Sequence, residues 1–103
     1  MRVDLQRLED QLDEPLRRAT AERLAASVAP FEHRIEQVSV RYSQVREGMT
    51  EVLVILMLRH GRRLAVRGAG RSYSVALSEA CLSVVNQLRS RWGRVLEQQR
   101  VSS

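Results

Sequence analysis

Two segments of the chain repeat their apolar positions with the period of a helix. The first begins near Asp13 and ends before Pro30, and apolar or small residues recur in it every four positions. These residues are Leu16, Thr20, Leu24 and Val28. Asp13 is a residue type that caps helices, and Pro15 suits the first turn, where its missing N–H costs nothing. The second helix is predicted from about Ser72 to Gln98, with its apolar positions on one face. They are Leu77, Cys81, Val84, Leu88, Trp92 and Val95.

The other segments have the period of strands. "MRVDLQRL" (1–8) and "IEQVSVRYS" (35–43) alternate apolar and polar residues, as half-buried strands do. "EVLVILMLR" (51–59) is apolar on both faces and rich in β-branched residues, which predicts an interior strand. After a tight hairpin at "HGR", the segment "RLAVRG" (63–68) alternates again, with Leu64 and Val66 expected inward and Arg63, Ala65 and Arg67 outward.

The predicted order is β-α-β-β-β-α in a single domain, residues 1–103. A right-handed crossover makes the first two strands parallel, and the others form a meander. We therefore expect an α+β two-layer sandwich, a four-stranded sheet with both helices on one face.

Asp4 and Glu9 interrupt any signal peptide, and the longest apolar run, Val52–Leu58, is far shorter than the roughly 20 residues of a membrane helix. No membrane partner is expected, and the predicted location is cytoplasmic.

Charge is distributed unevenly along the chain. The net charge is +5, and all 17 basic residues are arginines. Residues 1–51 contain eight arginines and ten acidic residues, whereas residues 52–103 contain nine arginines and only two acidic residues. Such a bias favours a polyanionic partner. The lack of lysine fits codon usage in a GC-rich genome. Whatever its origin, the arginines suit an RNA partner, because a planar guanidinium group forms two parallel hydrogen bonds with a phosphate and stacks on bases.

The glycines of "RHGRRLAVRGAGRSYS" do not form a nucleotide cradle. A dinucleotide fingerprint needs a third glycine where Tyr73 stands, and a Walker loop needs a lysine. We expect Gly68 and Gly70 to permit the turn from strand to helix instead.

Enzyme chemistry finds no support in the sequence. His33 and His60 have no cysteine or carboxylate at ligand spacing, so a solvated or capping role is expected for each. Cys81 lies in an apolar helical pattern and is expected in the core. No nucleophile–base pair is evident. We therefore predict no catalytic residue, no cofactor, no metal and no small-molecule substrate.

Several arginines are predicted on one sheet edge and the adjoining helix, with few acids near them. Arg59, Arg62, Arg63, Arg67 and Arg71 belong to the last hairpin, the last strand and the turn after it. Arg89, Arg91 and Arg94 flank the apolar face of the last helix. Basic residues on the flanks of a helix can contact the phosphates along an RNA groove and recognise its shape rather than its sequence. With about six phosphates engaged, log affinity should fall against log salt with a slope of about −4 to −5.

Motifs over nearly the whole chain resemble the ribosome hibernation family, which comprises the ribosome-associated inhibitor and hibernation-promoting factors (the sigma-54 modulation family). "LDEPLRRATAERLA", "FEHRIEQVSVRYS" and "GRRLAVRGAGRSYSVALSEACLSVVNQLRSR" carry the resemblance. The chain is similar to the short, non-dimerising form. It diverges at Ser72-Tyr73-Ser74, where the family has an acidic–apolar–Tyr signature, and at Asn86, where it has a basic residue.

The resemblance implies a non-enzymatic factor for translation regulation in stress and stationary phase. Such a factor binds rRNA of the small ribosomal subunit in the mRNA and tRNA channel and silences idle ribosomes. It also implies that Arg17, Arg23 and Arg89 contact rRNA, with Arg91 and Arg94 as neighbours.

Two alternatives remain open at this point. One is a protein-interaction module that self-associates through its sheet edges, with the acidic half of one copy against the basic half of another. The other is a binder of a different structured RNA. A monomer with at most weak self-association is expected.

Overall fold

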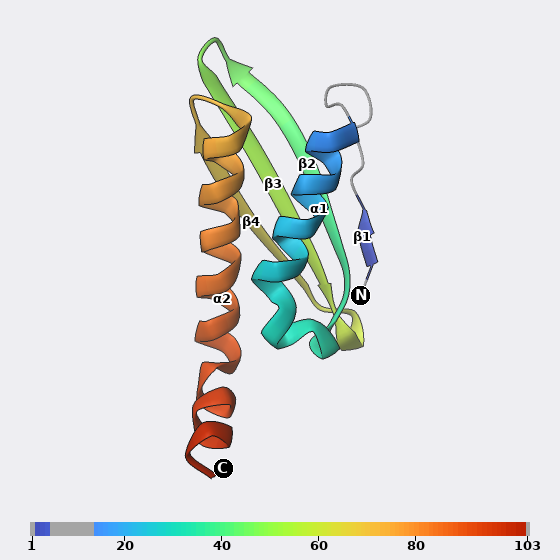
Figure 1. The fold of residues 1–103 in the computed structure, drawn as a ribbon, viewed down its shortest axis with the longest axis vertical. Coiled ribbons are helices and arrows are strands. Elements are labelled where there is room, and N and C mark those ends of the chain that lie inside the picture. Colours follow the sequence, from blue (N-terminus) through green and yellow to red (C-terminus); the bar gives the residue numbers. More distant parts are fainter. Residues whose placement is uncertain (1, 5–13, 103) are drawn as a thin grey trace.

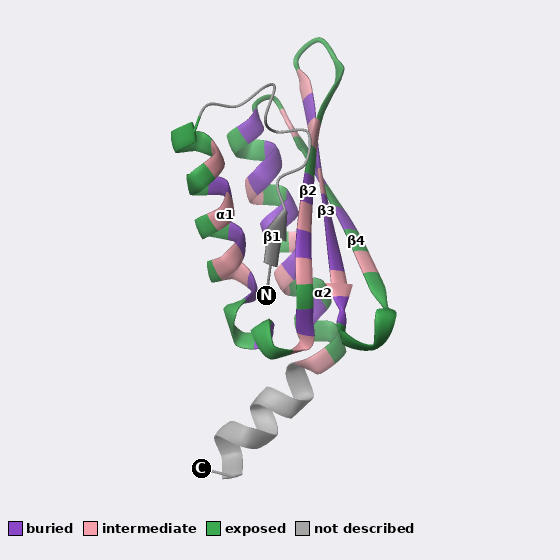
Figure 2. Cartoon of the chain, turned by 90° about the vertical axis from the view of Figure 1, so that its right-hand side faces the viewer, coloured by how far each residue is buried: buried purple, intermediate pink, exposed green. Residues whose placement is uncertain are grey.

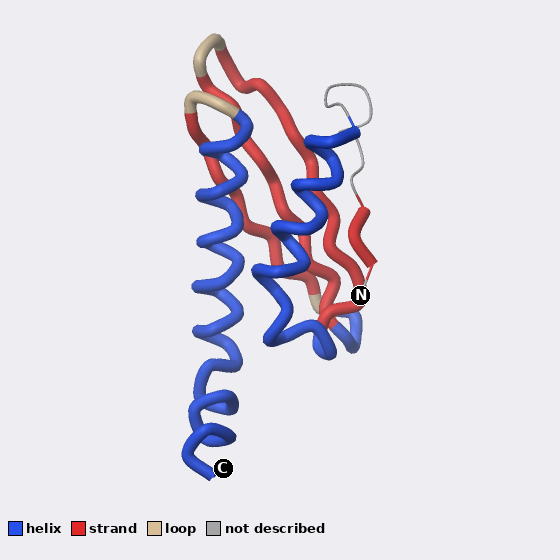
Figure 3. The backbone as a smooth tube through the Cα atoms, viewed as in Figure 1, coloured by secondary structure: helices blue, strands red, loops and turns tan. Residues whose placement is uncertain are grey.

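The computed structural model describes residues 2–4 and 14–102, and side chains from residue 14 to residue 92. Two long helices pack in front of a sheet (Figures 1 and 3). The elements are β1 (Arg2–Asp4), α1 (Glu14–Val28), the 3-10 helix η1 (Ala29–Arg34), β2 (Ile35–Arg46), β3 (Met49–Leu58), the 3-10 helix η2 (Arg59–Gly61), β4 (Arg63–Gly70) and α2 (Tyr73–Ser102). The predicted α+β class is confirmed.

The sheet has the strand order β1-β2-β3-β4. The three long strands β2, β3 and β4 form the antiparallel meander, in which Val54 of β3 lies between Val40 of β2 and Val66 of β4. β1 is short and pairs in parallel with β2 from Arg2 to Asp4. The rest of the predicted first strand, and the predicted cap Asp13, lie outside the described residues.

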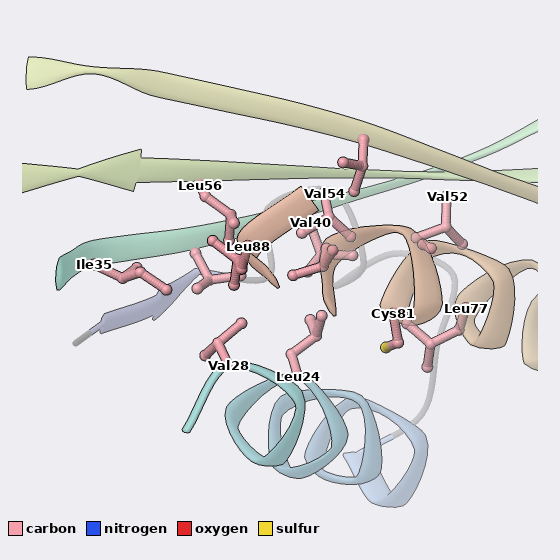
Figure 4. Packing of buried hydrophobic residues seen from close by; sticks show 14 of the residues in the cluster. Leu24, Val28, Ile35, Val40, Val52, Val54, Leu56, Leu77, Cys81 and Leu88 are labelled. Atoms are coloured by element: carbon pink, nitrogen blue, oxygen red, sulfur yellow. The ribbon is translucent and has the colours of Figure 1, made fainter. Parts of the chain in front are cut away.

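The core fills the space between the helices and one face of the sheet (Figure 2). Alternate residues of β3 turn their side chains to this side because successive strand residues point to opposite faces. Val52, Val54 and Leu56 are fully buried there. Leu24 of α1 and Leu88 of α2 point toward them, and Figure 4 shows how the two helices close over the sheet.

The predicted stripe of α1 is buried except at its first position. Thr20, Leu24 and Val28 have no exposed surface, whereas Leu16 is 39% exposed. The helix ends at Val28, and Pro30 stands in the first turn of η1, where a proline needs no N–H partner. Pro30 thus ends the first helix as predicted, and the chain continues as a 3-10 helix.

α2 approaches β4 very closely at Gly68. A Cβ atom placed on Gly68 would overlap the carbonyl oxygen of Ala76 and the backbone nitrogen of Ala80. Neither Gly68 nor Gly70 has a positive φ, which among the described residues occurs only at Gly48, His60 and Gly61. Both glycines lie in β4, before the turn into α2 that they were predicted to permit, and they make room for the start and the body of the helix because they lack a Cβ.

Candidate nucleic-acid interface

Arg23 is held at the junction of the two helices. Its side chain is exposed, and its Nη2 donates a hydrogen bond of 2.7 Å to the hydroxyl of Ser78 in α2. The Ser78 hydroxyl in turn donates to the carbonyl oxygen of Ser74 at 2.9 Å. A guanidinium fixed in this way loses less side-chain entropy when it binds a phosphate.

Arg89 lies on the same side of the helical layer. It is exposed, and it follows Ser78 by eleven residues, which is close to three full turns and about 16 Å along the helix. We call the side of the two helices that carries Arg23 and Arg89 the helical surface. The outer side of the helices also exposes Glu22 and Glu79, so its positive potential is diluted.

Arg17 does not join this surface. It precedes Arg23 by six residues, which places the two side chains about 120° apart around α1. Arg17 is only 29% exposed, and its Nη1 lies 3.4 Å from Oε2 of Glu14. The structure therefore places Arg17 and Arg23 on different sides of α1, although the resemblance to the hibernation family assigned both of them to one RNA contact.

Arg63 and Arg67 lie on the opposite side of the molecule. They pair across the sheet with Met57 and Leu53, whose positions alternate with the buried ones, so both arginines point to the sheet face that the helices leave open. Arg67 is 71% exposed and lies 3.8 Å from Glu51, a weak surface ion pair. The sequence predicted one continuous basic edge, but strand alternation places these arginines and those of α2 on different faces.

A basic cluster lies at the end of the sheet where β2 begins and β3 ends. It surrounds a cavity of about 630 Å³, which we call the end pocket. Four arginines, two histidines and a tryptophan line the end pocket, with no carboxylate among its lining residues. The lining residues are His33, Arg34, Leu58, Arg59, His60, Arg62, Arg91 and Trp92.

A tight turn between β3 and β4 forms one wall of the end pocket. Three residues, Arg59–Gly61, connect the paired positions Leu58 and Arg62, and two of them, His60 (φ 72°, ψ 22°) and Gly61 (φ 79°), are in the left-handed region. The N–H of Leu58 donates to the carbonyl oxygen of Arg62 at 2.7 Å across this turn. The hairpin predicted at "HGR" is confirmed.

Trp92 forms the aromatic wall of the end pocket. The guanidinium carbons of Arg34 and Arg91 lie 5.1 and 5.8 Å from the centre of its ring, within the range of cation–π attraction. The ring of Phe31, which is buried, lies 5.9 Å away and fixes the indole from the side of the core. The two guanidinium groups are thereby oriented while their side chains remain at the surface.

Sequence reasoning did not find the end pocket, because its residues come from three distant segments. His33 and His60 are both exposed, as the predicted solvated role requires, but the sequence did not show that they lie at one pocket. The signal was present in the predicted topology, since the start of "IEQVSVRYS" and the "HGR" hairpin lie at the same end of an antiparallel pair. The predicted site residue Arg91 does line the end pocket, whereas the side chain of Arg94 lies outside the described residues.

Other chemistry is weakly supported within the described part of the chain. No group of three or more side chains that could ligate a metal occurs in it. Burial raises the pKa of the Cys81 thiol, with smaller opposing effects from Ser27 and Arg23, so this thiol is protonated and poorly nucleophilic. Neither described helix has the length and apolarity that crossing a membrane requires.

No protein-family model and no curated protein matches the chain. Solved structures do match it. A ribosomal subunit interface protein from Coxiella burnetii is similar over 90% of this chain and 99% of its own, with a TM-score of 0.75 and 13% sequence identity. The N-terminal domain of Protein Y from Thermus thermophilus is similar over 86% of this chain and 93% of its own, with a TM-score of 0.65 and 16% identity.

These similarities establish the fold. The chain shares its order of helices and strands with two proteins that differ from it at more than four of every five positions. The fold implied by the sequence resemblance is therefore confirmed. What the chain does with this fold has to be argued from its own surfaces.

Proposed function

We propose that the protein binds the ribosome, and specifically that it occupies the mRNA and tRNA channel of the small subunit through contacts with rRNA phosphates. The observation that carries the proposal is the shared fold, which spans nearly the full length of a ribosomal subunit interface protein. The basic surfaces of the chain give this fold a physical means of holding RNA.

Arginines on the helical surface and in the end pocket supply the binding energy in this proposal. Arg23 and Arg89 are exposed and spaced along one side of the helices, which matches contact with a phosphate backbone rather than with a single base. Guanidinium groups bind phosphates through two parallel hydrogen bonds, and such contacts release condensed counterions. Binding is therefore strong at low salt and weakens steeply as salt rises.

Inhibition in this proposal requires no catalysis. A folded domain with a two-helix layer and a twisted sheet fills space that mRNA or tRNA would otherwise use. The ribosome is silenced while the protein is bound and released when it leaves. Hibernation of idle ribosomes, in stress or stationary phase, is the role that the sequence resemblance implies for such an occupant.

Co-sedimentation with purified ribosomal subunits tests the proposal. Between about 50 and 200 mM salt the protein should pellet with small subunits, and the bound fraction should fall steeply across this range. Arg46→Gln, at the far hairpin, removes one charge outside the proposed surfaces and should behave as the wild type. The proposal would be contradicted if the protein were absent from the small-subunit pellet at low salt, or if the bound fraction did not change with salt concentration.

Self-association is a second candidate, favoured by the uncovered sheet face. β4 is an edge strand, and the face opposite the helices carries Leu53, Ile55 and Met57 in a row along β3. Ile55 is nevertheless only 8% exposed, which limits the apolar area available to a second copy. Light scattering over the same salt series discriminates: a monomer throughout excludes this candidate, and a dimer that persists as salt rises supports it.

A further inference from the structure

We infer that the end pocket is a binding site for one unpaired nucleotide, whose base lies against the Trp92–Arg34 stack and whose phosphate contacts Arg59 and Arg62. The inference rests on the proposed function only for the source of the nucleotide, which would be a splayed-out residue of RNA. A free nucleotide has the same chemistry, so both sources are tested below.

The charges of the end pocket favour an anion. Four arginines line it, and no carboxylate among the described side chains forms an ion pair with any of them. Arg17 and Arg67, by contrast, each lie near a carboxylate, that of Glu14 and that of Glu51. Cations that converge without counter-charges repel one another, and a bound phosphate would relieve this repulsion.

The shape and the aromatic wall favour a planar ring beside that anion. Trp92 is partly exposed, and its indole holds the guanidinium groups of Arg34 and Arg91 as flat, oriented surfaces. Bases of single-stranded nucleic acids stack on such indole and guanidinium planes. A cavity of about 630 Å³ is within the range of pockets that hold small ligands, so it has room for one nucleotide.

The backbone of the turn gives an independent indication. His60 is the one described residue other than glycine with a positive φ, in a position where asparagine or glycine would fit with less strain. Strained backbone that persists at a pocket points to a role for the side chain. The imidazole of His60 lines the end pocket, where its N–H can donate to a phosphate or a base edge.

Trp92 is the only tryptophan of the chain, so its fluorescence reports the end pocket directly. The intact protein is titrated at low salt with AMP, adenosine, inorganic phosphate and a short single-stranded RNA. AMP and the RNA should each quench Trp92 saturably, and adenosine or phosphate alone should bind at least about tenfold more weakly than AMP, because each makes only part of the contacts. RNA binding tighter than AMP identifies RNA as the source, and AMP binding tighter identifies a free nucleotide.

Variants separate the end pocket from the rest of the molecule. The pair Arg59→Gln and Arg62→Gln is in an exposed turn and should weaken AMP and RNA binding at least about tenfold, with an unchanged circular dichroism spectrum. Arg46→Gln, at the other end of β2, is the matched control and should bind as the wild type. Wild-type affinity in the turn variant, or no saturable quenching by AMP and RNA, would overturn the inference.

His60→Asn tests the strained turn. Asparagine accepts the left-handed conformation, so thermal stability should be kept or raised while nucleotide affinity falls by about threefold or more. Nucleotide binding as in the wild type would overturn the role given to His60. Small-subunit co-sedimentation of the same variants is measured in parallel. In the wild-type protein, saturable quenching without co-sedimentation would contradict only the proposed function, and co-sedimentation without saturable quenching would contradict only the inference.

Discussion

The hydroxyl groups of Thr20 and Tyr73 lie 2.7 Å apart and join α1 to the first turn of α2. Thr20 already donates its proton to the carbonyl oxygen of Leu16 at 2.8 Å, so Tyr73 is the donor in the bond between the two side chains. The ring of Tyr73 also meets Tyr42 of β2 edge-on, with 5.3 Å between the ring centres. The divergent Ser72-Tyr73-Ser74 therefore connects both helices and the sheet.

Removing either hydroxyl should destabilise the fold by different amounts. Thr20→Val leaves the buried Tyr73 hydroxyl without its acceptor and should cost about 1–3 kcal/mol in the free energy of unfolding. Tyr73→Phe leaves Thr20 bonded to Leu16 and should cost about 0.5–1.5 kcal/mol. Urea unfolding of both variants and of the double variant measures the coupling, and a larger loss in Tyr73→Phe would contradict the donor assignment.

Stability should fall in alkaline solution because of two buried groups. Burial is the largest cause of the raised pKa of Tyr73, above its ordinary value of 10.0, and likewise of Cys81, above 9.0. The unfolded chain loses these protons at a lower pH than the folded chain does. Burial of the protonated groups therefore contributes its full stabilisation below the pKa of the unfolded chain, and this contribution is lost as the pH rises through the pKa of the folded chain. Melting temperatures should decline above about pH 9, more gently in Tyr73→Phe and Cys81→Ala. Identical slopes in all three proteins would exclude these groups as the cause.

Gly68→Ala should be severely destabilising. The added Cβ would overlap backbone atoms of Ala76 and Ala80, which cannot move without lifting α2 from the sheet. The expected cost is about 3 kcal/mol, at the upper end for overpacking. Ala69→Ser, at the exposed neighbouring position, should change stability by less than about 0.5 kcal/mol. A Gly68→Ala protein as stable as Ala69→Ser would show that the helix packs elsewhere.

Local pattern was enough to predict the elements of the fold. Four-residue spacing located α1, strand alternation located β2 and β4, and the apolar run located the interior strand β3. The predicted start of the last helix at Ser72 agrees with the structure, in which the Ser72 hydroxyl accepts a hydrogen bond from the N–H of Val75 at 3.3 Å. Patterns of this kind are local because they follow from the periods of 3.6 and 2 residues. They could not show η1, whose 3-10 helix follows the helix end at Val28.

The candidate site was harder to predict than the fold. Net charge indicated a polyanion, but charge along a sequence does not tell which face a side chain occupies. Alternation did predict that Arg63 and Arg67 point outward, which the register confirms, but the net charge had grouped them with the arginines of α2 on the other side. Arg34, Arg62 and Trp92 meet only because the end of η1, the turn after β3 and part of α2 lie at the same end of the sheet. These residues are brought together by tertiary packing, which depends on the lengths of β2, β3 and α2 together and not on a local sequence pattern.

The salt dependence of ribosome binding should report individual phosphate contacts. Replacing Arg23 and Arg89 together by glutamine removes two exposed charges of the helical surface. The slope of log affinity against log salt, about −4 to −5 for about six contacts, should become shallower by about 1.5 to 2. Arg46→Gln should leave the slope unchanged. An unaltered slope in the paired variant would show that the helical surface does not face rRNA.

Competition for the small subunit tests the central claim most directly. Purified small subunits are loaded with labelled mRNA and tRNA, and the protein is added in increasing amounts at constant low salt before sedimentation. Occupancy of the channel predicts that mRNA and tRNA leave the pellet in proportion as the protein enters it. Co-sedimentation of the protein together with undiminished mRNA and tRNA would contradict the account.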